Sequence, residues 1–183
     1  KYGKNETKKF FQNTIEGSNF TKNIIQEYNI DCDLTGDSNY EVAPHPSYFE
    51  GIKEEAATYK KEFGIETKVF SKEEFNEIGH GGNEQFGAMS YKPGFAINPL
   101  KFLLGIANVA NNSGVKIFQK SKVTKIEKFK GKFKIISNGS IVKANKIVMA
   151  TNGFYKDDIF PKLNNMILPV ISNIIITRPL TTE

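Results

Sequence analysis

Apolar and polar positions alternate with a helical period in the first third of the chain. Within residues 1–30, apolar residues recur mostly three or four positions apart: Phe10, Phe11, Ile15, Phe20, Ile24, Ile25 and Tyr28. Residues 49–63 repeat this pattern and end at Gly64, and Ser71 with Glu74 forms a capping-box signature. The pattern predicts one or two amphipathic helices before residue 30, another over residues 49–63, and a short one after Ser71.

The stretch from 98 to 118 predicts the best-defined helix. Asn98 is a favoured N-cap residue, and Pro99 suits a first helical turn, where its missing N–H would have no partner. Gly114 is expected to end the helix in a left-handed conformation. The segment VKIF follows it and predicts a strand, so this unit is interpreted as a helix that leads into an interior sheet.

Strand signals fall before and after this helix. Short strands are expected around Tyr40 and over residues 65–70, and a Gly-rich loop over residues 79–88. Further along, KVTKIEKF, KFKIIS and IVKA are separated by Lys-Gly and Asn-Gly pairs, which predicts a three-stranded antiparallel meander. The continuous apolar run over residues 147–150 is typical of a strand buried on both faces in a parallel sheet, and residues 168–180 predict a long final strand.

Composition indicates a folded, water-soluble chain. Of its 183 residues, 39% are apolar and 25% charged, and no apolar run is long enough to span a bilayer. The amino end lacks the apolar stretch of a secretory signal. Cys32 is the only cysteine and cannot form an internal disulfide, so a reducing compartment, the cytoplasm, is expected.

Charge is divided unevenly along the chain. Residues 1–99 contain 11 Lys and 16 acidic residues, whereas residues 100–183 contain 13 Lys, one Arg and 4 acidic residues. Ten lysines and one acid, Glu127, lie between Lys116 and Lys146. This lysine-rich meander is either a face for an anionic partner or the solvated outer face of strands whose inner face holds apolar residues. With only one Arg in the chain, the second interpretation is favoured and no nucleic-acid partner is expected.

The sequence offers few other chemical motifs. His45 and His80 are the only histidines and lack the spacing of a metal site, so no metal is expected. No GxSxG elbow or GxxxxGK[ST] phosphate loop occurs. The segment ATNG, Ala150 to Gly153, follows the apolar run, where open α/β sheets place ligands, and its small residues would let a ligand approach the backbone. An ordinary turn would have the same sequence.

An ordered series of segments is similar to a known family. The series runs through PGFAINPLKFLLGIANVANNSGVKIF, KVTKIE, the Asn-Gly meander, KIVMATNGF and LPVISNIIITRPL. It resembles the interior of FAD-dependent oxidoreductases of the D-amino-acid oxidase and glycine oxidase (DAO) family, especially the bacterial branch similar to gamma-glutamylputrescine oxidoreductase. The resemblance is good over residues 86–183 and diffuse over residues 1–85.

The resemblance implies a fold, a cofactor and a set of contacts. The fold class is α/β with α+β character: part of an FAD-binding Rossmann-like domain with a β-meander (98–163), and an antiparallel or mixed-sheet substrate domain (1–97, with 164–183 as a further strand). The implied activity is oxidation of an amine or amino acid by hydride transfer to flavin. The implied FAD contacts are Val123, Ala150, Thr151, Asn152 and Gly153.

Substrate residues are less specifically marked. Arg178, the sole guanidinium, is a candidate partner for a substrate carboxylate, and Tyr91 is a candidate substrate contact, with packing as the alternative for both. No residue is assigned a catalytic role.

The chain departs from the family pattern because it contains no GxGxxG for the flavin pyrophosphate. It therefore resembles an interior fragment whose partner is the rest of a full-length chain, and which alone binds FAD weakly or not at all. The alternative function is a non-catalytic binding domain that uses the lysine-rich meander on an anionic partner.

Overall fold

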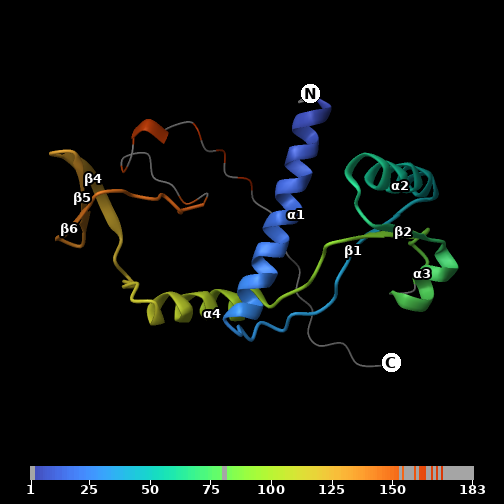
Figure 1. The fold of residues 1–183 in the computed structure, drawn as a ribbon, viewed down its shortest axis with the longest axis horizontal. Helices are drawn as coiled ribbons and strands as arrows, with labels where there is room; N and C mark the ends of the chain where they lie inside the picture. The colour runs from blue at the N-terminus through green and yellow to red at the C-terminus, as the bar shows by residue number, and fades with distance from the viewer. Residues whose placement is uncertain are drawn as a thin grey trace. The chain divides into compact units, whose positions relative to one another are not determined.

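The computed structural model describes residues 3–79 and 82–152, and from there to residue 170 a few further positions: Phe154, Ile159, Pro161–Leu163, Met166, Leu168 and Val170. The chain divides into two compact units, residues 1–117 and residues 118–183 (Figure 1). Each unit contains a three-stranded antiparallel sheet. The mixed helix and strand content confirms the predicted fold class, and no described helix has the length and hydropathy to cross a bilayer.

The sheet of unit 1 has the strand order β1-β3-β2. Strand β3 (Ala88–Tyr91) lies between β1 (Asn39–Val42) and β2 (Thr67–Phe70) and pairs antiparallel with both. The sequence pattern predicts the two outer strands but not β3, which has only four residues next to the Gly-rich segment. Ala88 and Met89 of β3 are fully buried, so the missed strand is the centre of the sheet.

Helix α2 (Pro46–Thr58) covers one face of this sheet. Ile52 and Ala56 of α2 pack with Met89 of β3 in a buried cluster. The helix continues as a π-helical turn, η1 (Tyr59–Phe63), and ends at Gly64, whose φ of 68° explains why glycine stands there. The predicted end of this helix is confirmed.

Helix α3 (Lys72–Ile78) begins with the capping box that the sequence predicted. The Ser71 hydroxyl accepts a hydrogen bond from the Glu74 N–H at 3.2 Å, and the Glu74 carboxylate accepts one from the Ser71 N–H at 2.8 Å. Phe75 of this helix is buried beside Phe70 and Ala88 of the sheet. The two capped N–H groups explain how a helix of seven residues is held in place.

Helices α1 (Lys4–Glu27) and α4 (Pro99–Asn112) meet in a second buried cluster. The expected one or two helices before residue 30 are thus the single helix α1. Ile25, Ile30 and Cys32 are the buried members of the cluster, and apolar side chains of α4 pack against them. A Cβ added at Gly105 would lie 2.3 Å from Ile30 Cγ2, so the close approach of the two segments requires glycine at this position.

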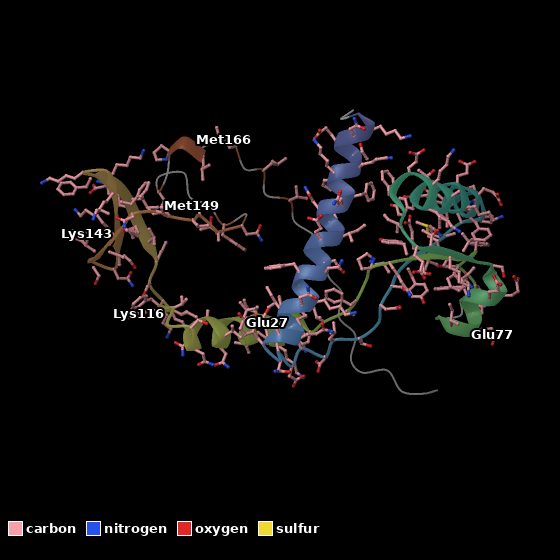
Figure 2. All side chains as sticks on the ribbon, in the orientation of Figure 1. Glu27, Glu77, Lys116, Lys143, Met149 and Met166 are labelled. Atoms are coloured by element: carbon pink, nitrogen blue, oxygen red, sulfur yellow. The ribbon has the colours of Figure 1, made fainter. Side chains whose placement is uncertain are left out.

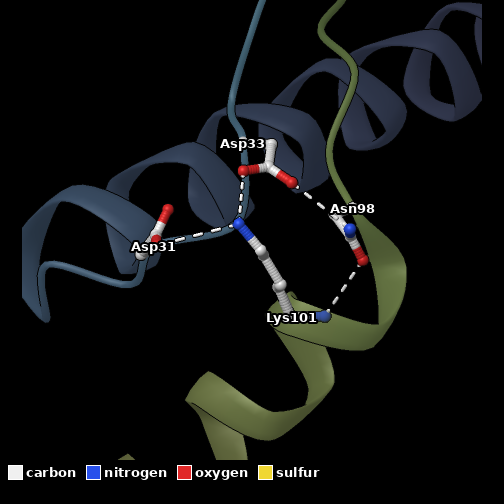
Figure 3. A network of polar contacts seen from close by, with 4 residues as sticks. All are labelled: Asp31, Asp33, Asn98 and Lys101. Carbon is white, nitrogen blue, oxygen red and sulfur yellow. Dashed lines mark hydrogen bonds and ion pairs between the residues drawn. The ribbon is translucent and has the colours of Figure 1, made fainter.

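A polar network ties the start of α4 to the segment after α1 (Figure 3). The Asn98 side chain accepts the Lys101 N–H at 3.2 Å, which confirms the predicted N-cap, and donates to Asp33 at 3.3 Å. The Lys101 ammonium lies 2.6 Å from Asp33 and 3.8 Å from Asp31. The hydrogen bond from the Lys101 ammonium lowers the pKa of the Asp33 carboxyl.

Unit 2 contains the predicted meander: β4 (Val123–Phe129), β5 (Lys132–Ser137) and β6 (Ser140–Ala144), in that order. Each connection is a two-residue turn in which both residues have a positive φ. The values are 49° at Lys130 and 75° at Gly131 in the first turn, and 46° at Asn138 and 79° at Gly139 in the second. This is the backbone of a type I′ turn, which matches the twist of antiparallel strands. The described part of unit 2 also includes a 3₁₀ turn, η2 (Pro161–Leu163).

Two predicted strands are wrong. Residues 115–118 and residues 146–150 have no regular structure, and Val148 is 87% exposed. A parallel strand is buried on both faces only where strands pair with it and helices cover it. No described strand pairs with either segment. The long strand predicted over residues 168–180 falls almost entirely outside the described residues.

Candidate functional site

The four described positions among the predicted FAD contacts lie in unit 2. Val123 is half-buried at the start of β4 and pairs with Ser137, next to an irregularity in the register. Ala150, Thr151 and Asn152 are exposed in the irregular segment after β6. Met149, which directly precedes them in the chain, is labelled in Figure 2. The fifth position, Gly153, lies outside the described residues.

The ATNG segment has the backbone of a turn. Asn152 has a φ of 50°, and the Thr151 carbonyl accepts a hydrogen bond from the Phe154 N–H at 3.0 Å. Because the described side chains of this segment are exposed, they do not enclose a ring system. These exposed residues alone therefore do not form a flavin site.

Tyr91, the candidate substrate contact, lines a cavity of about 340 Å³ in unit 1. The walls come from α1, the first residue of β1, the turn η1 and the segment that follows β3. They consist of Phe11, Thr14, Ile15, Ser18, Asn39, Tyr59, Ile65, Tyr91, Lys92, Pro93, Gly94 and Phe95. The structure thus places Tyr91 beside residues up to 80 positions away in sequence. Arg178, the other substrate candidate, lies outside the described residues.

Aromatic rings form much of this wall. The Tyr59 ring meets the edge of Phe11 at a centroid distance of 5.6 Å and that of Tyr91 at 5.7 Å. Burial raises the pKa of the Tyr59 hydroxyl, and the nearby Glu55 carboxylate raises it further. The hydroxyl therefore stays protonated at neutral pH.

The segment after β3 brings polar groups to the same cavity. The Asn39 amide donates to the Pro93 carbonyl at 3.1 Å. The Lys92 ammonium lies 3.0 Å from Asp37 and 3.5 Å from Glu66. Hydrogen bonding to Asp37, followed by the two negative charges, raises the pKa of the Lys92 ammonium. The cavity therefore combines aromatic surface with a cation that is already paired.

Among the cavity residues, only Tyr91 was predicted from the sequence as a substrate contact. Phe11 and Tyr59 were visible only as members of helical apolar faces, which is the signal of packing. Asn39 carried no motif. Only the fold of unit 1 reveals that these three residues line the same cavity.

The remaining chemical candidates have structural roles. Cys32 is 1% exposed and is a buried member of the cluster between α1 and α4. His45 caps α2, where its Nδ1 accepts the Ser47 N–H at 3.4 Å. His80 is outside the described residues. Among residues that the structure describes, no three His, Cys, Asp or Glu side chains are grouped as metal ligands would be.

The fold is similar to those of several solved oxidoreductases. It is similar to glycine oxidase from Geobacillus kaustophilus, with a TM-score of 0.63 and 16% identity over 75% of this chain and 37% of that one. Glycine oxidase from Bacillus cereus ATCC 14579 has a TM-score of 0.62, with 17% identity over 82% of this chain and 40% of that one. For L-proline dehydrogenase from P. horikoshii, the TM-score is 0.59, with 21% identity over 73% of this chain and 36% of that one.

Sequence comparison gives the family directly. The sequence model of the DAO family, described as FAD dependent oxidoreductase, matches residues 2–183, and the chain belongs to this family. The family's cofactor is FAD. The probable oxidoreductase OrdL of Haemophilus influenzae is 26% identical over 187 residues, which cover 98% of this chain and 42% of that protein. The chain thus spans less than half the length of these relatives.

Proposed function

We propose that this chain is part of an FAD-dependent oxidoreductase that oxidises an amine or an amino acid. The observation that carries the proposal is the family match over residues 2–183. The names of the similar structures support the substrate class, because glycine and L-proline both bear an amine on the carbon next to the carboxylate. FAD, when bound, would accept a hydride from this carbon, and water would hydrolyse the resulting imine.

The proposal assigns different roles to different parts of the chain. Residues 1–97 with 164–183 would belong to the substrate domain, and residues 98–163 to the FAD domain. Val123 and the segment from Ala150 to Gly153 would contact FAD, with Arg178 and Tyr91 toward the substrate. The position of Tyr91 at a cavity supports the last assignment. The comparisons offer no support for the alternative of a non-catalytic domain that binds an anionic partner through the lysine-rich meander.

The test is anaerobic reduction of the flavin in the full-length protein that contains this chain. Glycine, sarcosine, proline and putrescine are each mixed with the FAD-loaded protein, and the flavin absorbance is followed. We expect at least one amine or amino acid to bleach the flavin. Glycolate, in which a hydroxyl replaces the amine of glycine, is the matched control and should leave it oxidised. Bleaching by glycolate, or by none of a broad set of amines and amino acids, would contradict the proposal.

A second measurement concerns the polypeptide of residues 1–183 by itself. Its described FAD candidates are exposed and do not enclose a ring. We expect it to bind FAD weakly or not at all in an absorbance titration. Tight binding of one FAD per chain would show that residues 1–183 are sufficient to hold the cofactor.

A further inference from the structure

One end of the meander in unit 2 concentrates lysines around an exposed aromatic ring. We propose that this end, at the turn between β4 and β5, binds the surface of an anionic lipid bilayer. This basic end consists of Lys128, Phe129, Lys130, Lys132, Lys134 and Lys143. The inference concerns where the protein docks and not the reaction, so it stands or falls separately from the proposed function.

The two ends of the meander differ in charge. Residues 128–134 have the sequence KFKGKFK, with four lysines and no acid, and Lys143 lies directly opposite Lys134 on the neighbouring strand. At the other end, residues 135–142 include the Asn-Gly turn and contain no charged residue. Among the lysines of the three strands and their turns, only Lys125 lies outside the basic end.

Most of this positive charge is not neutralised within the part of the chain that the structure describes. Glu127 is the only acid in the meander, and its carboxylate lies 2.7 Å from the Lys125 ammonium and 3.5 Å from that of Lys134. The other four lysines of the basic end make no ion pair with described residues. Lys134 and Lys143 are like charges directly opposite each other, which destabilises a sheet. An anionic surface would relieve this repulsion.

The lysines border a hollow that fits an anionic headgroup. Its volume is about 270 Å³, and its lining consists of Phe129, Lys130, Lys132, Phe133, Lys134 and Lys143. Four lysines from β5, β6 and the turn before β5 thus surround one space. Lysine binds phosphate as a flexible point charge, so this lining suits lipid headgroups, which vary in position, better than one fixed anion.

The exposed ring at the turn favours a lipid surface over a soluble anion. Phe129 is the last residue of β4 and is 55% exposed. The Lys130 ammonium lies 5.5 Å from the centre of this ring, so the apolar group is flanked by positive charge. At a bilayer surface such a ring enters the boundary between headgroups and acyl chains, while lysines reach the phosphates. A soluble polyanion such as heparin offers charge but no apolar layer for the ring.

The primary test measures co-sedimentation of the FAD-loaded, full-length protein with lipid vesicles. Vesicles of phosphatidylcholine alone are compared with vesicles of equal parts phosphatidylcholine and phosphatidylglycerol. We expect binding to the anionic vesicles, little binding to the neutral ones, and release at high salt, which screens exposed charges. No binding to the anionic vesicles, or equal binding to both kinds, would overturn the proposal. Binding to heparin but not to vesicles would also overturn it, because the partner would then be a soluble polyanion.

The second test locates the binding by charge. Lys132→Gln combined with Lys143→Gln removes two exposed charges from the basic end. We expect binding to the anionic vesicles to weaken about ten- to thirty-fold, because each lysine close to such a surface contributes roughly five-fold. Lys116→Gln combined with Lys122→Gln is the matched control, since both lysines are exposed and lie outside the basic end. Equal losses in the two double variants would place the binding elsewhere and refute the surface.

The third test concerns the aromatic ring. Phe129→Ala should weaken binding to the anionic vesicles several-fold and leave binding to heparin unchanged, because only the bilayer takes up an apolar group. Ile141→Ala is the matched control: Ile141 is 54% exposed, close to the 55% of Phe129, and lies toward the other end of the meander. Equal effects of the two substitutions on vesicle binding would show that the Phe129 ring does not enter the bilayer, and would overturn the choice of a lipid surface.

Discussion

The two units of the chain are stabilised in different ways. In unit 1, buried residues lie between positions 25 and 94, and most of the apolar ones belong to three clusters. In the described part of unit 2, every residue retains some exposure, and the meander is defined by strand pairing and two tight turns. The stability of unit 1 therefore depends on the packing of buried side chains, whereas the stability of the meander depends on strand pairing and on the backbone conformation of its turns.

The units also differ in charge. Residues 1–117 contain 13 Lys and 16 acidic residues, whereas residues 118–183 contain 11 Lys, one Arg and 4 acidic residues. In the meander, Glu127 pairs with Lys125 at 2.7 Å and with Lys134 at 3.5 Å. Lys143 on β6, labelled in Figure 2, has no ion pair among the described residues. Unit 1 therefore carries a net negative charge and unit 2 a net positive charge.

The largest expected effect is loss of core volume in unit 1. Met89→Ala removes a fully buried side chain and should lower the free energy of unfolding of unit 1 by about 2–5 kcal/mol. Val142→Ala is the control in unit 2, because Val142 is 52% exposed, and it should cost well under about 1 kcal/mol. Hydrogen exchange followed by mass spectrometry reports on each unit separately. Comparable losses for both variants would remove the distinction between the units.

A smaller effect is expected from the turns of the meander. Gly139 has a φ of 79°, so Gly139→Ala puts a Cβ on a left-handed residue and should destabilise the meander by about 1–2 kcal/mol. Gly51→Ala is the control: this exposed helical position has open space around it, and alanine should be neutral or stabilise by about 0.5–1 kcal/mol. The readout is hydrogen-exchange protection of β5 and β6. Unchanged protection in Gly139→Ala would show that the turn does not determine the meander.

The smallest effect is a pH dependence at the junction of α1 and α4. The Lys101 ammonium lowers the pKa of Asp33 from its ordinary value of 3.8. The pair therefore contributes stability above that value, and this contribution is lost as the pH falls through the lower pKa of the folded state. Lys101→Met should lower the melting temperature slightly near neutral pH. The difference in melting temperature between this variant and the wild type should shrink below about pH 4.

The control for this experiment is Lys116→Met. Lys116 is exposed and makes no ion pair with the described residues, so its substitution should produce no such pH-dependent difference. If the melting temperatures of Lys101→Met and the wild type still differ at the lowest pH, that outcome would assign the loss of stability to the aliphatic part of Lys101 and not to its charge.

Local signals in the sequence predicted local structure correctly. The capping box at Ser71, the N-cap at Asn98 and the turn at Asn138 all involve groups within a few residues of one another, and the structure contains each of them. The family resemblance was also correct, and with it the cofactor. The apolar run over residues 147–150 failed as a predictor because burial requires neighbours, which hydrophobicity alone cannot supply.

The central strand and the cavity required the tertiary structure. Strand β3 is too short to have a distinct pattern, and it is a strand because β1 and β2 pair with it on both sides. Phe11, Asn39 and Tyr59 carry no shared motif, and α1, β1 and η1 bring them to one cavity.

The sequence by itself determined the helix ends at Gly64, Ser71 and Asn98 and the two turns of the meander, because caps, glycines and prolines act on the backbone within a turn or two. It also determined the family and the unequal charge of the two halves. Tertiary structure alone decided which apolar residues are buried, which strand is central and which side chains share a cavity. These outcomes depend on contacts between residues distant in the chain, and such contacts exist only after the chain has folded.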